Sequence, residues 1–219
     1  MIAEIGHYAI ALALMLSVVQ GIIPLIGAHR KDAVLMGVAR PAARGQFLFV
    51  TIAFVALTIS FVNSDFSVAL VSQHSHTLKP MLYKVSGVWG NHEGSMLLWI
   101  LILALFGLLV SEFGRNLPTG LRARVLGIQG LIGLGFLAFL LFTSNPFLRL
   151  DPAPVQGEGL NPLLQDPGLA FHPPFLYLGY VGFSMAFSFA IAALIEGRVD
   201  PAWARWVRPW TLVAWIALT

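Results

Sequence analysis

Long apolar runs are the feature that most limits what this chain can fold into. A helix needs about 20 apolar residues to cross the roughly 30 Å hydrocarbon core of a bilayer, because each residue adds about 1.5 Å. The segments that reach or approach this length are 8–28, 47–71, 94–110, 125–142 and 173–195. A sixth run begins at Trp210 and continues to Thr219. We therefore predict an all-α fold, a polytopic integral membrane helical bundle with five complete transmembrane helices plus the start of a sixth.

Composition supports a membrane protein and narrows its chemistry. Charged residues make up 11% of the chain, against about 25% in soluble proteins, and the mean hydropathy is +0.81. The chain has no cysteine, which excludes a disulfide framework, a thiolate metal site, a catalytic cysteine and a CxxCH haem site within it. Any chemistry must therefore use histidine, carboxylates or a bound ligand. We expect membrane lipid around the chain and no nucleic-acid partner, because its few basic residues are spread over short loops.

The distribution of basic residues predicts the orientation. Lysine and arginine are retained in cytoplasmic loops. Ten of the thirteen follow the first, third and fifth expected spans: Arg30, Lys31, Arg40, Arg44, Arg115, Arg122, Arg124, Arg198, Arg205 and Arg208. We therefore expect an N-terminus outside, cytoplasmic loops 29–46, 111–124 and 196–209, and outer loops 72–93 and 143–172. Residues 1–219 would form a single transmembrane domain, the N-terminal part of a longer protein.

Five of the six histidines lie on or near the expected outer face. We interpret His7, His74 and His76, together with His29 on the other side, as polar residues of the membrane interface. His74 and His76 have no third ligand nearby in the sequence, so we predict no metal site there.

The first outer loop ends in "VSGVWGNHEGSMLLW", which is more specific. Trp89 and Trp99 suit a membrane interface, and Glu93 suits the positive end of a helix dipole. His92 and Glu93 side by side could orient a ligand, shuttle a proton or only cap the helix, and the sequence leaves these roles open.

The second outer loop combines turn signals with exposed apolar residues. It is rich in proline, yet it contains Leu160, Leu163, Leu164, Leu169 and Phe171. A solvated loop would not carry such residues. We expect it to lie on the membrane surface or to pack against other outer elements, as one wall of an apolar cavity.

His172 follows that loop and precedes two prolines. Proline is tolerated in the first turn of a helix, so we expect Pro173 and Pro174 to begin the fifth span, with His172 at or near its N-cap. The helix dipole would keep the imidazole neutral, as a metal ligand must be. Tyr177 and other aromatic residues follow, so the site suits a flat apolar macrocycle. A simple helix cap is the alternative.

Three strings carry a family resemblance. "EIGHYAIALAL", "SGVWGNHEGSMLLW" and "GEGLNPLLQDPGLAFHPPFLYLGYVGFSMAFSFAIAAL" resemble the CcmF family of cytochrome c-type biogenesis proteins, across essentially the whole chain. The resemblance implies an enzyme, a cytochrome c haem lyase of the bacterial inner membrane. It would take haem b from the chaperone CcmE and join it to the CxxCH thiols of an apocytochrome c presented with CcmH.

The same resemblance implies site residues. His172 would be an axial ligand to the iron of the haem in transit, on the periplasmic face. The expected pocket residues are Trp89, His92, Glu93, Pro173, Pro174 and Tyr177. A structural b-type haem and a tryptophan-rich platform would come from residues beyond this chain, so the chain alone should be inactive.

Two alternative functions are a related lyase dedicated to nitrite reductase haem and a membrane transporter subunit. A transporter usually keeps ionisable residues inside its spans, and here only Asp65 falls within one.

Overall fold

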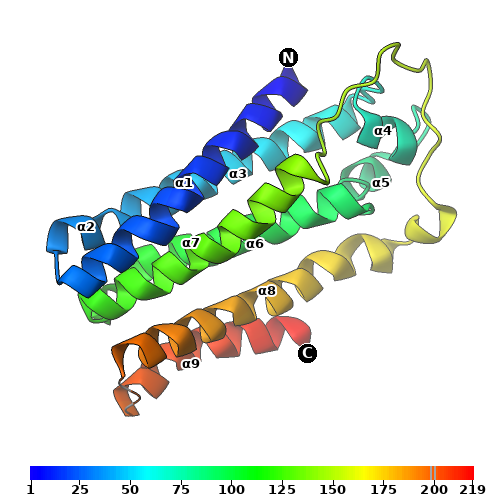
Figure 1. The fold of residues 1–219 in the computed structure, drawn as a ribbon. Coiled ribbons are helices and arrows are strands. Elements are labelled where there is room, and N and C mark those ends of the chain that lie inside the picture. The colour runs from blue at the N-terminus through cyan, green and yellow to red at the C-terminus, as the bar shows by residue number, and fades with distance from the viewer. Residues whose placement is uncertain (198, 200) are drawn as a thin grey trace.

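The computed structural model describes residues 1–197, 199 and 201–219, and this part of the chain is helical (Figure 1). In chain order the elements are α1 (Ile2–Arg30), α2 (Ala33–Gly37), α3 (Ala39–Val62), α4 (Ala69–His74), α5 (Met81–Ser86), α6 (His92–Phe113), the 3-10 turn η1 (Gly114–Asn116), α7 (Thr119–Phe142), the 3-10 turn η2 (Pro162–Leu164), α8 (Pro167–Glu196) and α9 (Pro201–Leu218). Extended pairing in the described residues is a single bridge between Val68 and Arg149. The predicted all-α class is confirmed.

The long helices lie side by side as a bundle (Figure 1). Helix α1 packs between α3 and α7, and α8 packs against α6, α7 and α9. One end of the bundle, here named the α2 end, holds α2, η1 and the connection from α8 to α9. The opposite end, named the α4 end, holds α4, α5 and η2.

The helices that are long and apolar enough to cross a membrane are α1, α2 with α3, α6 with η1, α7 and α8. They correspond to the five predicted spans and support a multi-pass membrane protein. The number that cross a bilayer and the orientation of the bundle stay predictions. Arg198, one of the ten basic residues used for the orientation, and position 200 in the predicted loop 196–209 lie outside the described residues.

Two predicted spans are placed wrongly along the chain. The second was expected at 47–71, but α3 begins at Ala39 and ends at Val62, before Ser64 takes a positive φ of 55°. The sixth was expected from Trp210, but α9 begins at Pro201. Arginine did not stop α3, because Arg40 and Arg44 both pair with Glu112 of α6. An ion pair satisfies charges near a helix end that would otherwise face a low dielectric.

The start of the fifth span was also predicted wrongly. Helix α8 begins at Pro167, since the Asp166 carboxylate caps it by accepting hydrogen bonds from Gly168 N (2.8 Å) and Leu169 N (3.3 Å). His172 therefore lies in the second turn and is not the N-cap. Pro173 and Pro174 lie inside the helix, where each removes one backbone hydrogen bond.

The α4 end is held together by Arg149, which follows α7. Its guanidinium donates to Glu4 Oε1 at the start of α1 (Nε, 2.9 Å) and to Asp65 Oδ2 beyond α3 (Nη1, 3.2 Å). Backbone bonds from Ala69 N to Leu148 O and from Leu150 N to Ser67 O, both 2.8 Å, run beside it. Asp65 thus lies beyond the end of α3 and has a structural role, rather than being a charge within a span.

A second outer contact is made by Lys79, which is buried between α4 and α5. Its ammonium donates to the His74 carbonyl (2.8 Å) and lies 6.0 Å from the centre of the Phe61 ring. Burial lowers the pKa of Lys79 to about 8, and the nearby charge of Lys84 acts in the same direction. The short outer helices are therefore packed onto the end of α3.

Small residues let α1 and α7 approach closely. A Cβ atom built on Gly130 would lie 2.6 Å from the backbone nitrogen of Gly21, which leaves no room for a side chain. Next to this contact, Gln20 Nε2 donates to Leu126 O across the same interface (2.9 Å). Membrane helices associate through such close packing, because lipid provides little hydrophobic driving force between them.

We expect Gly130→Leu to separate α1 from α7 and to lower the free energy of unfolding by about 1–3 kcal/mol, the usual cost of overpacking. The measurement is the unfolding midpoint of the purified protein in detergent. Gly135→Leu is the matched control on the same helix, because a Cβ atom there meets nothing within 4 Å. Equal midpoints for the two variants would show that the close contact does not stabilise the bundle.

Candidate functional site

The start of α6 is fixed by Asn91. Its side chain accepts from Gly94 N (2.7 Å) and donates to Gly87 O (2.7 Å) and Val88 O (3.2 Å). A side chain at Gly94 would overlap the Val88 carbonyl oxygen, so glycine is required. The helix cap is therefore Asn91, which the sequence analysis did not identify, although asparagine before an apolar helix is a common capping signal.

His92 and Glu93 are the first two residues of α6. Glu93 lies in the first turn, where a carboxylate interacts favourably with the helix dipole. His92 is exposed, and its ring meets Phe139 of α7 edge to face at 6.4 Å between centroids. Its imidazole therefore stands at the mouth of the groove between α6 and α7.

One hydrogen bond joins this region to α8. The Trp89 indole Nε1 donates to the carbonyl of Ala170 at 3.0 Å. In a regular helix that carbonyl would accept from residue 174, but Pro174 has no N–H. Trp89 therefore satisfies a buried acceptor that the proline leaves without a helical partner.

Two adjoining cavities open beside this bond. The first, named the outer cavity, has a volume of about 310 Å³ and is lined by Ser86, Trp89, Gly90, Asn91, His92, Ser95, Leu160, Leu164, Leu169, Pro173 and Tyr177. The second, named the inner cavity, has about 190 Å³ and is lined by His92, Ser95, Met96, Trp99, Phe136 and Tyr177. His92, Ser95 and Tyr177 contribute to both. Aromatic and leucine walls with one imidazole and a few hydroxyls suit a largely apolar, flat ligand.

The second outer loop forms part of these walls, as the sequence predicted. Leu160, Leu164 and Leu169 face the outer cavity, while Leu163 and Phe171 are exposed. Glu158 N donates to Ser72 O (2.7 Å) and Gly159 N to Ser75 O (3.1 Å), so the loop packs against α4.

The predicted pocket residues divide into two groups. Trp89, His92, Pro173 and Tyr177 line the outer cavity, whereas His172, Glu93 and Pro174 do not. Leu169, Pro173 and Tyr177 are spaced four residues apart and therefore share one face of α8.

His172 lies on a different face of α8. It is seven residues before Gly179, about two helical turns, so the two share a face. Gly179 packs against Leu218 of α9. His172 is thus on the side of α8 that meets α9 further along the helix. The side chain is exposed and has no hydrogen-bond partner among the described residues.

The other outer histidines make local contacts. His7 Nδ1 lies 3.0 Å from Asn145 Nδ2, His74 Nδ1 lies 3.1 Å from Leu70 O, and His76 Nδ1 accepts from Leu78 N (3.2 Å). Within the part of the chain that the structure describes, no three His, Asp or Glu side chains are grouped to hold a metal ion. If a histidine in this region binds a metal ion, that ion would therefore arrive as part of a larger bound molecule.

Residues 89–219 match the sequence model of the family described as cytochrome C assembly protein. The chain belongs to this family. The match begins at Trp89, so it includes α6, α8 and nearly all residues of both cavities.

The relatives agree. The chain is 69% identical over 219 residues to the cytochrome c-type biogenesis protein ccl1 of Rhodobacter capsulatus, covering 100% of this chain and 34% of the relative. It is 40% identical over 219 residues to the cytochrome c-type biogenesis protein NrfE of Haemophilus influenzae, with the same coverage. A solved structure named cytochrome c heme lyase CcmF superposes with a TM-score of 0.85 at 29% identity, over 99% of this chain and 34% of that one. The chain thus spans about a third of the length of the curated relatives it matches.

We expect Trp89→Phe to loosen the first turns of α8, because the Ala170 carbonyl would lose its donor at a cost of about 1–3 kcal/mol. Hydrogen exchange should become faster in peptides that cover residues 167–177 and stay unchanged in α1 and α3. Trp99→Phe is the control, since Trp99 packs on Phe136 (4.8 Å between centroids) without a hydrogen bond in the described structure. Equal exchange in both variants would contradict the role given to the indole N–H.

Proposed function

We propose that this chain is part of a cytochrome c haem lyase that positions haem for thioether attachment to the CxxCH thiols of apocytochrome c. The observation that carries this proposal is that the family match, residues 89–219, contains both the aromatic cavities and the exposed His172 at the same end of the bundle. Haem here is a substrate in transit, a b-type haem before attachment.

The residues present suit such a substrate. The outer cavity offers Trp89, Tyr177 and leucine side chains to an apolar ring edge. The imidazole of His172 is exposed and has no partner among the described residues, and we propose it as the axial ligand. The adjacent Pro173 and Pro174 fix the backbone φ angles after it, so the histidine projects from a stiff segment.

The chain's contribution to the reaction is positioning. Holding the porphyrin in one orientation brings its vinyl groups to the two thiols in a fixed order and raises their effective concentration. His92 and Glu93 would shape the floor of the pocket at the start of α6. A protein nucleophile is not required, in keeping with a sequence that has no cysteine.

The proposed setting is the bacterial inner membrane, with the α4 end in the periplasm. CcmE would supply the haem and CcmH would present the apocytochrome. A structural b-type haem and the tryptophan-rich platform would come from the two thirds of the relatives' length that this chain does not cover.

The alternatives are less well supported. A general lyase is favoured over one dedicated to nitrite reductase, because identity is 69% to ccl1 and 40% to NrfE. A transporter would need ionisable residues along its path. The ion pairs Arg40–Glu112, Arg44–Glu112 and Arg124–Glu196 instead lie at the α2 end of the candidate spans.

We expect His172→Ala to reduce the yield of mature cytochrome c by about tenfold or more, because the proposed iron ligand is lost. Changes to the coordination shells of other metal sites have effects of this size. Haem-stained gels and the haem absorption spectrum of the purified protein measure this. Added imidazole should restore part of the yield. His92→Ala should lower it only partly, and His76→Ala, a matched change at the same end, should leave it unchanged. A wild-type spectrum and yield in His172→Ala would rule out ligation by this residue.

The orientation can be tested with single cysteines, because the chain has none. Val155 in the second outer loop is 98% exposed and Val34 at the α2 end is 79% exposed. We expect Val155→Cys to react with an impermeant thiol reagent in intact cells with permeable outer membranes, and Val34→Cys to react only after lysis. The reverse pattern would overturn the predicted N-out topology.

A further inference from the structure

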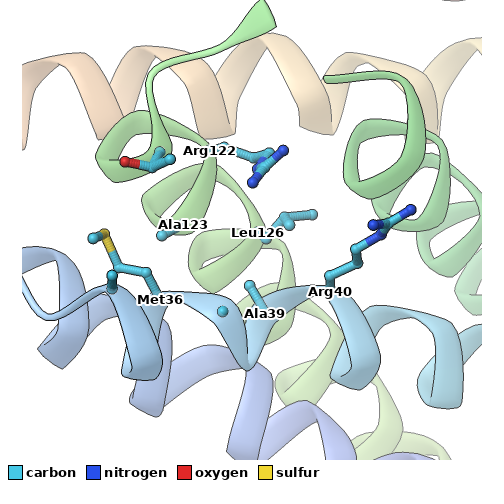
Figure 2. A pocket seen from close by; sticks show the side chains of 9 residues that line it. Met36, Ala39, Arg40, Arg122, Ala123 and Leu126 are labelled. Carbon is cyan, nitrogen blue, oxygen red and sulfur yellow. The ribbon is translucent and has the colours of Figure 1, made fainter. Parts of the chain in front are cut away.

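The α2 end carries a cavity that the proposed lyase function does not use. It has a volume of about 200 Å³ and lies between α2, the start of α3 and the start of α7 (Figure 2). The residues that line it are Ala33, Met36, Gly37, Ala39, Arg40, Thr119, Arg122, Ala123 and Leu126. We name it the basic cavity. It is at the opposite end of the bundle from His92 and His172.

The basic cavity has an apolar floor and a basic rim. Ala39, Ala123 and Leu126 line the cavity together with the two arginines, with Arg40 coming from α3 and Arg122 from α7 (Figure 2). Thr119 adds a hydroxyl at the first residue of α7, and no side chain caps this helix. The cavity therefore combines hydrogen-bond donors with a surface that favours hydrocarbon.

The charges around the basic cavity do not balance. Arg40 and Arg44 share one carboxylate, since Glu112 accepts from Arg40 Nε (3.2 Å) and from Arg44 Nε (2.6 Å) and Nη2 (3.0 Å). Arg122 has no partner among the described residues. One carboxylate thus pairs with two guanidinium groups, and a third guanidinium nearby has no partner among the described residues. The site therefore has a net positive charge.

The nearby acids are already engaged. Asp32 Oδ1 accepts from Val34 N (2.8 Å) and Leu35 N (3.2 Å) as the cap of α2. Glu196 pairs with Arg124, which also donates to Ala28 O (3.2 Å). Among the described residues no carboxylate lines the basic cavity, so Arg122 is open to an external anion.

We propose that the basic cavity binds the phosphate of an anionic phospholipid. The Arg122 guanidinium and the Thr119 hydroxyl donate to the phosphate oxygens, and Arg40 adds positive charge from the other side. The glycerol and the first acyl carbons lie on Met36, Ala39 and Leu126. With the predicted orientation this lipid belongs to the cytoplasmic leaflet, where anionic headgroups attract basic residues.

A lipid fits this cavity better than a soluble phosphate for two reasons. The cavity lies at the end of helices that are long enough to span a membrane, where headgroups are concentrated. Most of its lining is apolar. A fully hydrated anion would lose water on entering the cavity and would gain few polar contacts in return. Net positive charge favours an anionic headgroup over a zwitterionic one.

The test uses the complete protein, purified with the segments or subunits that complete it, and native mass spectrometry with added phosphatidylglycerol. We expect Arg122→Gln to weaken retention of this lipid about tenfold, since a charge-assisted hydrogen bond is lost. Arg122→Lys should weaken it less. Arg115→Gln is the matched control: it removes the same charge from the exposed η1 turn at the same end and should retain lipid like wild type.

A second variant tests the cavity without changing charge. Gly37 lines the basic cavity, and a Cβ atom there meets nothing within 4 Å, so Gly37→Leu can fill the space without a clash. We expect it to displace phosphatidylglycerol while the unfolding midpoint stays near that of wild type.

Several results would overturn the proposal. Equal retention in wild type, Arg122→Gln and Gly37→Leu would show that the lipid does not bind here. Equal loss in Arg122→Gln and Arg115→Gln would indicate general surface charge. Equally tight binding of phosphatidylcholine would remove the anionic preference, and displacement of lipid by millimolar inorganic phosphate would assign the site to a soluble anion. None of these outcomes depends on haem or on cytochrome c maturation.

Discussion

The hydrogen bond from the Trp89 indole to the Ala170 carbonyl is the interaction on which the candidate site depends. Pro174 cannot donate to that carbonyl, and a buried unsatisfied acceptor costs free energy comparable to a lost hydrogen bond. The donor comes from a segment 81 residues away, at the entrance to α6. The proline pair therefore does more than stiffen α8. It creates an acceptor that fixes α8 against α6 and so sets the width of the outer cavity between them.

This arrangement separates two properties of α8 that occupy adjacent positions in the sequence. Pro173 faces the outer cavity with Leu169 and Tyr177, whereas His172 faces the side on which Gly179 meets Leu218 of α9. In the proposed lyase, the axial ligand and the apolar wall therefore act on different parts of one macrocycle.

The sequence predicted the class of fold and several walls of the site, because apolar length and loop leucines depend on local composition. The sequence predicted helix bounds wrongly where residues far apart in the chain interact. Helix α3 extends back to Ala39 because Arg40 and Arg44 find Glu112 across the bundle, and this pairing is not visible in any periodicity. The start of α8 depends on local sequence: Asp166 followed by Pro167 is a strong capping signal, and it begins the helix before the two later prolines. The start of α8 determines which turn of the helix His172 occupies. The separation of His172 from the outer cavity therefore depends on that start.

The two ends of the bundle use polar residues differently. At the α4 end, Arg149 pairs with Glu4 and Asp65, and these ion pairs hold the segment after α7 against α1 and the end of α3. The exposed imidazole of His172 has no hydrogen-bond partner among the described residues. At the α2 end, Arg122 has no partner among the described residues and lies beside an apolar floor. The proposed anionic phospholipid would neutralise this guanidinium at the end of the candidate spans. The same bundle thus presents an exposed imidazole at one end and an apolar cavity with two arginines at the other.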